Sequence, residues 1–373
     1  MLLLICAFVF SFLATLLVVR SAAHHGHLSG DTDKAQPQKF HAHAVPRIGG
    51  VGIVVGVLAG GAAAFFSKTE GLALLVALGA CGLVAFAAGL IEDFTKRVTP
   101  KQRLLATVAA AALAVWLADA IISRTGIPGF DNLMVVAGFP LMLTLLAVAG
   151  VANSVNIIDG FNGLASMCVA IMLAALAYVA FQVNDYTIMH CALICLGAVL
   201  GFFVFNYPLG LIFLGDGGAY FLGFWVAELG ILLVHRNPAV SPVFPLLLCA
   251  YPIFETLFTM YRRRVIRGRP VGLPDATHLH SLIYRRLMRW AIGKRDAANL
   301  LRRNSMTSPY LWALCSMSVA PAVLWWDDGQ ALSVWLLLFC ASYLVIYRAI
   351  VQFRTPRFLL RKADHWAAPV EEH

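Results

Sequence analysis

Long apolar runs recur along this sequence, and they restrict its fold more than any other feature. A helix needs roughly 17–25 apolar residues to cross a bilayer. Runs of that length cover residues 1–19, 48–66, 71–91, 104–123, 132–152, 163–182, 187–205, 217–234, 242–261, 309–326 and 331–350. Because lipid offers the backbone no hydrogen bonds, each run must be a helix. The sequence therefore predicts an all-α polytopic integral membrane protein with about eleven transmembrane helices, forming one domain over residues 1–373.

The composition supports the same fold class. The chain is 60% hydrophobic and only 13% charged. A soluble protein of this length has far more surface to keep polar. Residues 1–19 lack the basic start of a signal peptide, so we expect them to remain as the first span, with a cleaved signal peptide as the alternative.

The positive charges predict the orientation. If the sides alternate, one side receives 25 of the 28 Lys and Arg residues, and the other receives only Lys68, Arg124 and Arg236. The positive-inside rule makes the rich side cytoplasmic, which places the N-terminus outside and the C-terminus in the cytoplasm. The predicted cytoplasmic segments are about 20–47, 92–103, 152–162, 206–216, 262–308 and 348–373. This asymmetry accounts for the net charge of +9, so we expect no nucleic-acid partner.

Acids, amides and histidines gather on this cytoplasmic side, which predicts a site there. In the first stretch, 39-KFHAHAVPRIGG-50, His41 and Arg47 precede two glycines at a helix start. Such a start can bring backbone N–H groups close to an anion. The alternative is a basic membrane anchor.

The second stretch is the acid pair Glu92-Asp93, which ends a helix and is followed by four basic residues. Adjacent acids repel, which raises one pKa and suits a general base or a metal ligand. Basic neighbours such as Arg103 suit a phosphate. The alternative is a solvated helix end.

The third stretch, 153-NSVNIIDGFNGLA-165, places amides and an acid between two apolar runs. In a helix, Asn153, Asn156 and Asp159 would lie near one face. Amides donate and accept hydrogen bonds, as a nucleotide or sugar requires. A polar loop without function is the alternative, but this one contains no Lys or Arg.

The fourth stretch begins at Asn206 and ends at Asp216, which lies among glycines just before a helix. Mg²⁺ takes few protein carboxylates and completes its shell with phosphate oxygens and water. Asp216 is therefore a candidate magnesium ligand, and an N-cap is the alternative.

The fifth stretch is the long basic loop 262–308, which contains His278 and His280. Their spacing does not suit a zinc pair, so we expect contact with phosphate. A patch for lipid headgroups is the alternative. Glu255 lies near Arg262, which predicts a structural ion pair.

In this order and on one side, the five stretches resemble the polyprenyl-phosphate N-acetylhexosamine-1-phosphate transferase family, over about residues 39–282. The resemblance implies transfer of a sugar-1-phosphate from a UDP-N-acetylhexosamine to undecaprenyl phosphate, with release of UMP. It implies a Mg²⁺ cofactor, with Mn²⁺ as the alternative, in an enzyme of the bacterial inner membrane. It also implies contact with membrane lipids, a homodimer, and a role in starting O-antigen or another cell-surface glycan.

The resemblance also implies roles for single residues. It implies that Glu92, Asp93 and Asp159 are catalytic and that Asp216 binds magnesium. The residues that it implies bind substrate are His41, Arg47, Arg103, Asn153, Asn156, Asn162, Asn206, His278 and His280. One of the acid pair would act as base toward the lipid phosphate or hold it near the metal.

The chain departs from the family pattern at several positions. The acid pair is Glu-Asp instead of Asp-Asp, Asn162 replaces a second acid, and Ser281 stands where many relatives have a further His. These departures leave open which acid is the base. The donor sugar and the choice between direct attack and a covalent intermediate also stay open. The alternatives are a phospho-N-acetylmuramoyl-pentapeptide transferase, a transporter, and an inactive scaffold.

Overall fold

The computed structural model describes residues 1–29, 45–127, 129–268, 277–292 and 297–352. These residues form helices and no strands, as predicted. The elements are α1 (Leu2–Ser29), α2 (Gly50–Phe66), α3 (Leu72–Thr95), α4 (Pro100–Ala118), η1 (Asp131–Val135), α5 (Phe139–Ile158), α6 (Leu164–Gln182), α7 (Tyr186–Asn206), α8 (Gly215–Arg236), α9 (Val243–Leu248), α10 (Ala250–Tyr261), η2 (Arg262–Ile266), α11 (Leu279–Leu282), η3 (Ile283–Met288), α12 (Arg289–Ile292), α13 (Ala297–Leu324) and α14 (Gly329–Val351).

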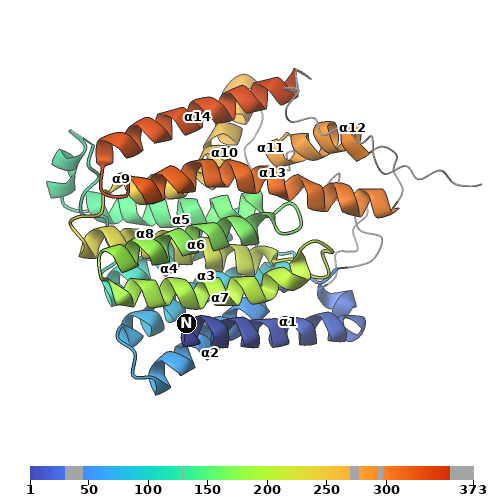
Figure 1. The fold of residues 1–373 in the computed structure, drawn as a ribbon, viewed down its shortest axis with the longest axis horizontal. Helices are drawn as coiled ribbons and strands as arrows, with labels where there is room; N and C mark the ends of the chain where they lie inside the picture. The colour runs from blue at the N-terminus through green and yellow to red at the C-terminus, as the bar shows by residue number, and fades with distance from the viewer. Residues whose placement is uncertain (30–44, 128, 269–276, 293–296, 353–373) are drawn as a thin grey trace, which may run out of the picture.

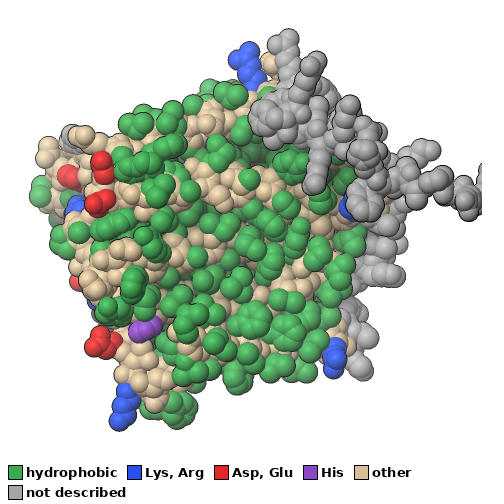
Figure 2. All heavy atoms as spheres, viewed as in Figure 1, with side chains coloured by type: hydrophobic (Ala, Val, Ile, Leu, Met, Phe, Trp, Pro, Cys, Tyr) green, Lys and Arg blue, Asp and Glu red, His purple; other side chains and the backbone are tan. Residues whose placement is uncertain are grey.

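The long helices lie side by side, with α1 and α2 along one flank and α13 and α14 along the other (Figure 1). Within the described ranges, eight helices are long and apolar enough to cross a membrane, namely α1, α3, α4, α5, α6, α7, α8 and α14. On the face in Figure 2, hydrophobic side chains cover the middle and charged ones lie toward the rims. The chain is therefore a multi-helix membrane protein.

The remaining predicted spans also fall on helices. The run 48–66 forms α2, a shorter apolar helix of 17 residues. The run 242–261 is divided at Cys249 into α9 and α10. The run 309–326 lies in the second half of α13. The count of eleven crossings and the orientation stay predictions.

One predicted boundary is wrong in a way that affects the site. The apolar run 132–152 is not one continuous helix. Gly138 has a φ of +84°, and α5 begins only after it, with proline in its first turn. The helix continues to Ile158, so Asn153 and Asn156 are helical and do not lie in the predicted loop 152–162. Helical spacing therefore decides which way these amides face.

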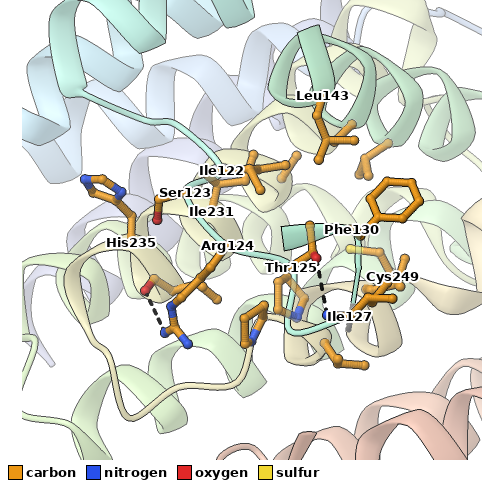
Figure 3. Close-up of a pocket in the computed structure, with 18 of the residues that line it drawn as sticks. Ile122, Ser123, Arg124, Thr125, Ile127, Phe130, Leu143, Ile231, His235 and Cys249 are labelled. Carbon is orange, nitrogen blue, oxygen red and sulfur yellow. Dashed lines mark hydrogen bonds between the residues drawn. The ribbon is translucent and has the colours of Figure 1, made fainter. Parts of the chain in front are cut away.

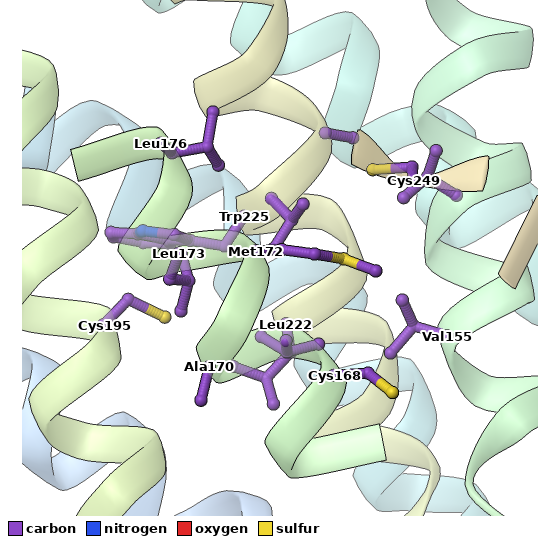
Figure 4. Close-up of a cluster of buried hydrophobic side chains, with 14 of the residues drawn as sticks. Val155, Cys168, Ala170, Met172, Leu173, Leu176, Cys195, Leu222, Trp225 and Cys249 are labelled. Atoms are coloured by element: carbon purple, nitrogen blue, oxygen red, sulfur yellow. The ribbon is translucent and has the colours of Figure 1, made fainter. Parts of the chain in front are cut away.

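Helix α8 is the central element of the bundle. Every residue from Gly217 to Val234 is buried, and the helix packs against α2 to α7 and α9. Figure 4 shows its Leu222 and Trp225 among apolar side chains from several neighbouring helices. The Trp225 indole N–H donates to the Cys191 carbonyl at 3.2 Å, so its polar atom is satisfied inside the core. A helix held on all sides gives a fixed starting point for the residues at its N-terminus.

Glycines set how closely other helices approach that N-terminus. A Cβ on Gly89 of α3 would lie 2.4 Å from the Gly217 nitrogen, and one on Gly50 of α2 would lie 2.6 Å from the Gly218 Cα. The N–H groups of Gly49 and Gly50 donate to the carbonyls of residues 213 and 214, at 2.9 Å each. The expectation that these N–H groups bind an anion is therefore wrong, since they join α2 to the start of α8.

We predict opposite effects for two Gly→Ala substitutions on α3. Gly89→Ala forces a methyl into the backbone of α8 and should destabilise the protein by about 1–3 kcal/mol. Gly79→Ala is the matched control, because no atom lies within 4 Å of its Cβ position. It should be neutral or stabilising, by up to about 1 kcal/mol. Thermal unfolding in detergent measures both, and equal effects would contradict the close contact between α3 and α8.

Candidate active site

Three carboxylates from distant parts of the sequence meet at one end of the bundle. Asp93 lies in the last turn of α3, Asp159 directly follows α5, and Asp216 lies in the first turn of α8. Mutual electrostatic effects link all three. The structure thus brings together acids from three of the predicted stretches.

Asp216 is the most highly connected of these acids. One carboxylate oxygen accepts a hydrogen bond from the Arg103 guanidinium. The other accepts one from the Asn156 amide at 3.1 Å and lies 3.9 Å from a guanidinium nitrogen of Arg47. The side chain is 13% exposed. Three residues from separate predicted stretches therefore surround the Asp216 carboxylate.

The two adjacent acids at the end of α3 have different hydrogen-bond partners. The Asp93 carboxylate is buried and accepts the backbone N–H groups of Asp216 and Gly217, both at 3.0 Å. These are among the N–H groups that a helix start leaves without partners inside the helix. The Glu92 carboxylate accepts the N–H of Val98 at 2.7 Å and closes the following turn. Of the two acids, Asp93 is the one joined to the Asp216 segment.

Asp159 has a different environment. Among the described residues its carboxylate has no hydrogen-bond or ion-pair partner. The pKa of this carboxyl is raised to about 7, mainly by burial; Arg47 opposes the rise, and the nearby Asp216 and Asp93 add to it. A carboxyl that titrates near neutral pH at such a place is suited to bind a cation or to exchange a proton.

The histidine stretch approaches the same loop. The rings of His278 and His280 are stacked, with centroids 5.1 Å apart, and His280 lies against Phe161 at 5.5 Å. The Nε2 of His280 is 3.1 Å from where a Cβ on Gly160 would stand. The histidines therefore lie next to the segment that follows α5, beside Asp159.

Asn162 and Asn206 are used differently from their predicted role as substrate ligands. Both are buried. The Asn206 amide accepts from the Gly163 N–H and donates to the Ile212 carbonyl, each at 2.8 Å. The Asn162 amide donates to the Pro208 carbonyl at 3.1 Å. These contacts join the loop after α5 to the loop after α7, which gives both amides a supporting role. Their direct contact with substrate stays a prediction.

One further predicted residue does not join the cluster. The Asn153 amide donates to the Ala149 carbonyl of its own helix at 2.7 Å, one turn farther from the helix end than Asn156. His41 lies outside the described residues. The structure therefore places Arg47, Arg103, Asn156 and the three acids together but leaves Asn153 apart.

Sequence reasoning missed a set of supporting residues on α13. The Asn304 side chain accepts the Asn162 N–H at 2.9 Å, Ser308 donates to the Asn162 carbonyl at 2.6 Å, and the Trp312 indole donates to the Gly163 carbonyl at 3.0 Å. Their spacing of four residues is a helical stripe, which is the signal that could have found them.

Tyr220 was also missed, although it lies one turn after Asp216 on the same face of α8. Its hydroxyl is 3.5 Å from the side-chain oxygen of Asn156. The i, i+4 spacing from the candidate metal ligand is a signal that could have found it.

The cluster has the donor chemistry for a divalent cation and a polyanion. Carboxylate and amide oxygens are ligands that Mg²⁺ prefers, and it completes its shell with phosphate oxygens and water. The described residues contain no group of three or more His, Cys, Asp and Glu that could hold a metal on its own. Arg47 and Arg103 supply guanidinium groups of the kind that recognise phosphate.

A hollow lies at the ends of the helices opposite the acid cluster. Figure 3 shows residues that line it. It has a volume of about 320 Å³ and is lined mainly by apolar side chains such as Phe130, Leu143 and Ile231. The Arg124 guanidinium at this cavity donates to the Val234 carbonyl at 3.2 Å and to the Val240 carbonyl at 2.7 Å. Among the described residues no carboxylate lines the cavity, in contrast to the acid cluster.

Comparison with known proteins agrees with this geometry. A family model described as glycosyl transferase family 4 matches residues 75–234, which include Asp93, Arg103, Asn156, Asp159 and Asp216. The chain is 27% identical to a probable undecaprenyl-phosphate N-acetylglucosaminyl 1-phosphate transferase of Bacillus subtilis, over 93% of this chain and 91% of that protein.

Two other relatives show the range of the similarity. The chain is 28% identical to an undecaprenyl-phosphate alpha-N-acetylglucosaminyl 1-phosphate transferase of Yersinia pestis, over 76% of each chain. It is 32% identical to a phospho-N-acetylmuramoyl-pentapeptide-transferase of Streptococcus uberis, over 45% of this chain and 52% of that protein. The predicted family is supported by the match to the glycosyl transferase family 4 model over residues 75–234 and by the similarity to these transferases.

Proposed function

We propose that this protein transfers a sugar-1-phosphate from a UDP-N-acetylhexosamine to undecaprenyl phosphate and releases UMP. The observation that carries the proposal is the Asp216 carboxylate, held by Asn156 and Arg103 with Arg47 and Asp159 beside it. Relatives named for this transfer match most of the chain. The reaction would begin a cell-surface glycan in the bacterial inner membrane.

The arrangement suits a reaction between two anions. Arg47 and Arg103 supply positive charge that offsets the repulsion between a diphosphate donor and a phosphate acceptor. Asn156 orients the Asp216 carboxylate, and Asp93 fixes the helix start that carries it. Asp216, with Asp159 near it, would hold Mg²⁺, which would polarise phosphoryl oxygens when bound. His278 and His280 would contact the donor phosphates.

The predicted topology fits this assignment. The cluster lies at the end of the bundle where the connections carry most of the Lys and Arg residues. If that end is cytoplasmic, a soluble nucleotide sugar reaches it from the cytoplasm while the lipid phosphate reaches it from the membrane interface. The homodimer stays a prediction.

The main alternative is the muramoyl-pentapeptide transferase, which has the same chemistry with a larger donor. The Streptococcus uberis relative with that name matches much less of this chain, 45% against 93% for the Bacillus subtilis relative. The longer match favours the N-acetylhexosamine donor.

We predict UMP release that depends on both lipid and metal. Purified protein given UDP-N-acetylglucosamine, undecaprenyl phosphate and Mg²⁺ should release UMP, and chelation should stop the release. Asp216→Asn should reduce the rate at least about 100-fold, because it removes a charge that holds the metal and counters the arginines.

Asp119→Asn is the control for this assay. That side chain is 84% exposed and lies at the opposite end of the bundle, so its loss should leave the rate unchanged. A folded protein that releases no UMP with any UDP-N-acetylhexosamine, or an Asp216→Asn variant of normal rate, would contradict the proposed function.

We predict that Asp159→Asn makes the protein more stable and less active. Since burial raises the pKa of this carboxyl to about 7, its ionisation costs stability as pH rises from about 4 to 7, and the cost levels off above 7. The Asn variant lacks this cost, so it should be more stable by about 1–3 kcal/mol at pH 8 and little changed at pH 4.

Unfolding curves at the two pH values, measured without metal or substrate, test the stability effect, and UMP release tests activity. A variant that loses stability at pH 8 would show that the Asp159 carboxylate is held by favourable contacts. That result would exclude a raised pKa for the Asp159 carboxyl.

A further inference from the structure

Glu255 of α10 is fully buried, and each of its contacts points to the histidine stretch or to the last helix. One carboxylate oxygen lies 3.0 Å from the His278 Nδ1 and accepts the Leu279 N–H at 3.2 Å. The other accepts the Tyr343 hydroxyl at 2.5 Å. The expected ion pair with Arg262 is wrong, since no such pair forms and Glu255 binds these groups instead.

The contact with His278 determines where that ring carries its proton. An ionised carboxylate only accepts hydrogen bonds, so the Nδ1 beside it must be the N–H nitrogen. The Thr259 hydroxyl lies 3.3 Å from the same Nδ1 and competes for the same side of the ring. The Nε2 has no hydrogen-bond partner among the described residues, and the side chain is 13% exposed. This nitrogen is therefore the one left for a ligand.

Helix α14 supports the arrangement from the far end of the sequence. Besides Tyr343, its Tyr347 hydroxyl donates to the Thr277 carbonyl at 3.2 Å. The Arg262 guanidinium donates to the same carbonyl at 2.6 Å and lies over the Tyr347 ring, 5.4 Å from its centroid. The residue just before His278 is thus fixed by two elements, which restricts the backbone that carries the ring.

We propose that Glu255 and Tyr343 are positioning residues that hold His278 with its proton on Nδ1 and its Nε2 directed to the phosphates of the donor. Tyr343 holds the carboxylate and the carboxylate holds the His278 ring. This ring stacks on His280, which lies beside Gly160 in the segment that follows α5. Only the identity of the ligand, the phosphates of the donor, rests on the proposed function. The matched family region ends at residue 234, so it includes none of these residues.

A double-substitution cycle on turnover tests the linkage. Glu255→Gln should lower the rate of UMP release about 10- to 100-fold, as outer partners of functional histidines commonly do, and His278→Ala should lower it at least as much. Because Glu255 acts through His278, adding Glu255→Gln to His278→Ala should lower the rate no further. Effects that multiply would overturn the proposal, since Glu255 would then act by another route.

The position of the His278 proton can also be measured by NMR, which tests the proposal even if one of the variants folds poorly. In ¹⁵N-histidine-labelled wild-type protein, the resonances lost in His278→Ala should show the proton on Nδ1. Tyr343→Phe removes one hydrogen bond but keeps the ring, so it should fold, shift these resonances, and reduce the rate about 2- to 10-fold. Tyr178→Phe, on the exposed side of α6, is the control and should change neither.

A proton on Nε2 in place of Nδ1, or resonances unchanged in Tyr343→Phe, would overturn the proposal. The ¹⁵N readout needs no turnover. It therefore separates failure of this proposal from failure of the proposed function, which would appear as wild-type protein that releases no UMP.

Discussion

The Asp93 carboxylate at the start of α8 is the interaction on which the rest of the site depends. It accepts two backbone N–H groups that the helix itself leaves unpaired. A negative charge at this position is also favoured by the helix dipole. Because α8 is enclosed by other helices along its length, fixing its first turn fixes Asp216 as well. The glycines of α2 and α3 are what let the helices approach closely enough for this contact.

A membrane protein must satisfy buried polar groups internally, and this constraint shapes the loops around the site. Asn162 and Asn206 bind backbone groups of loops that would otherwise be unpaired, and α13 adds Asn304 and Ser308. Such bonds hold the segment after α5 in one conformation. Asp159, which has no such partner among the described residues, is left available for a ligand.

The sequence predicted much of this architecture because membrane helices and clustered polar residues leave local signals. The apolar runs predicted the helices, and the charge asymmetry grouped Arg47, Arg103, Asn156, Asp159 and Asp216 before the structure placed them together. Position in the sequence alone could not show which side chains face the acid cluster. Asn162 and Asn206 look like ligands in the sequence, but their amides face backbone groups far away along the chain. The partner of Glu255 was also missed, because Tyr343 is 88 residues away and no local pattern connects them.

The central claim is that the cluster around Asp216 is where the metal and the diphosphate meet. The most direct test is an experimental structure of the protein with UDP-N-acetylglucosamine and Mn²⁺, in which anomalous scattering locates the ion. The account predicts an ion bound to the Asp216 carboxylate and a diphosphate beside Arg103 and Arg47. An ion or nucleotide bound elsewhere, such as in the apolar cavity near Arg124, would contradict it.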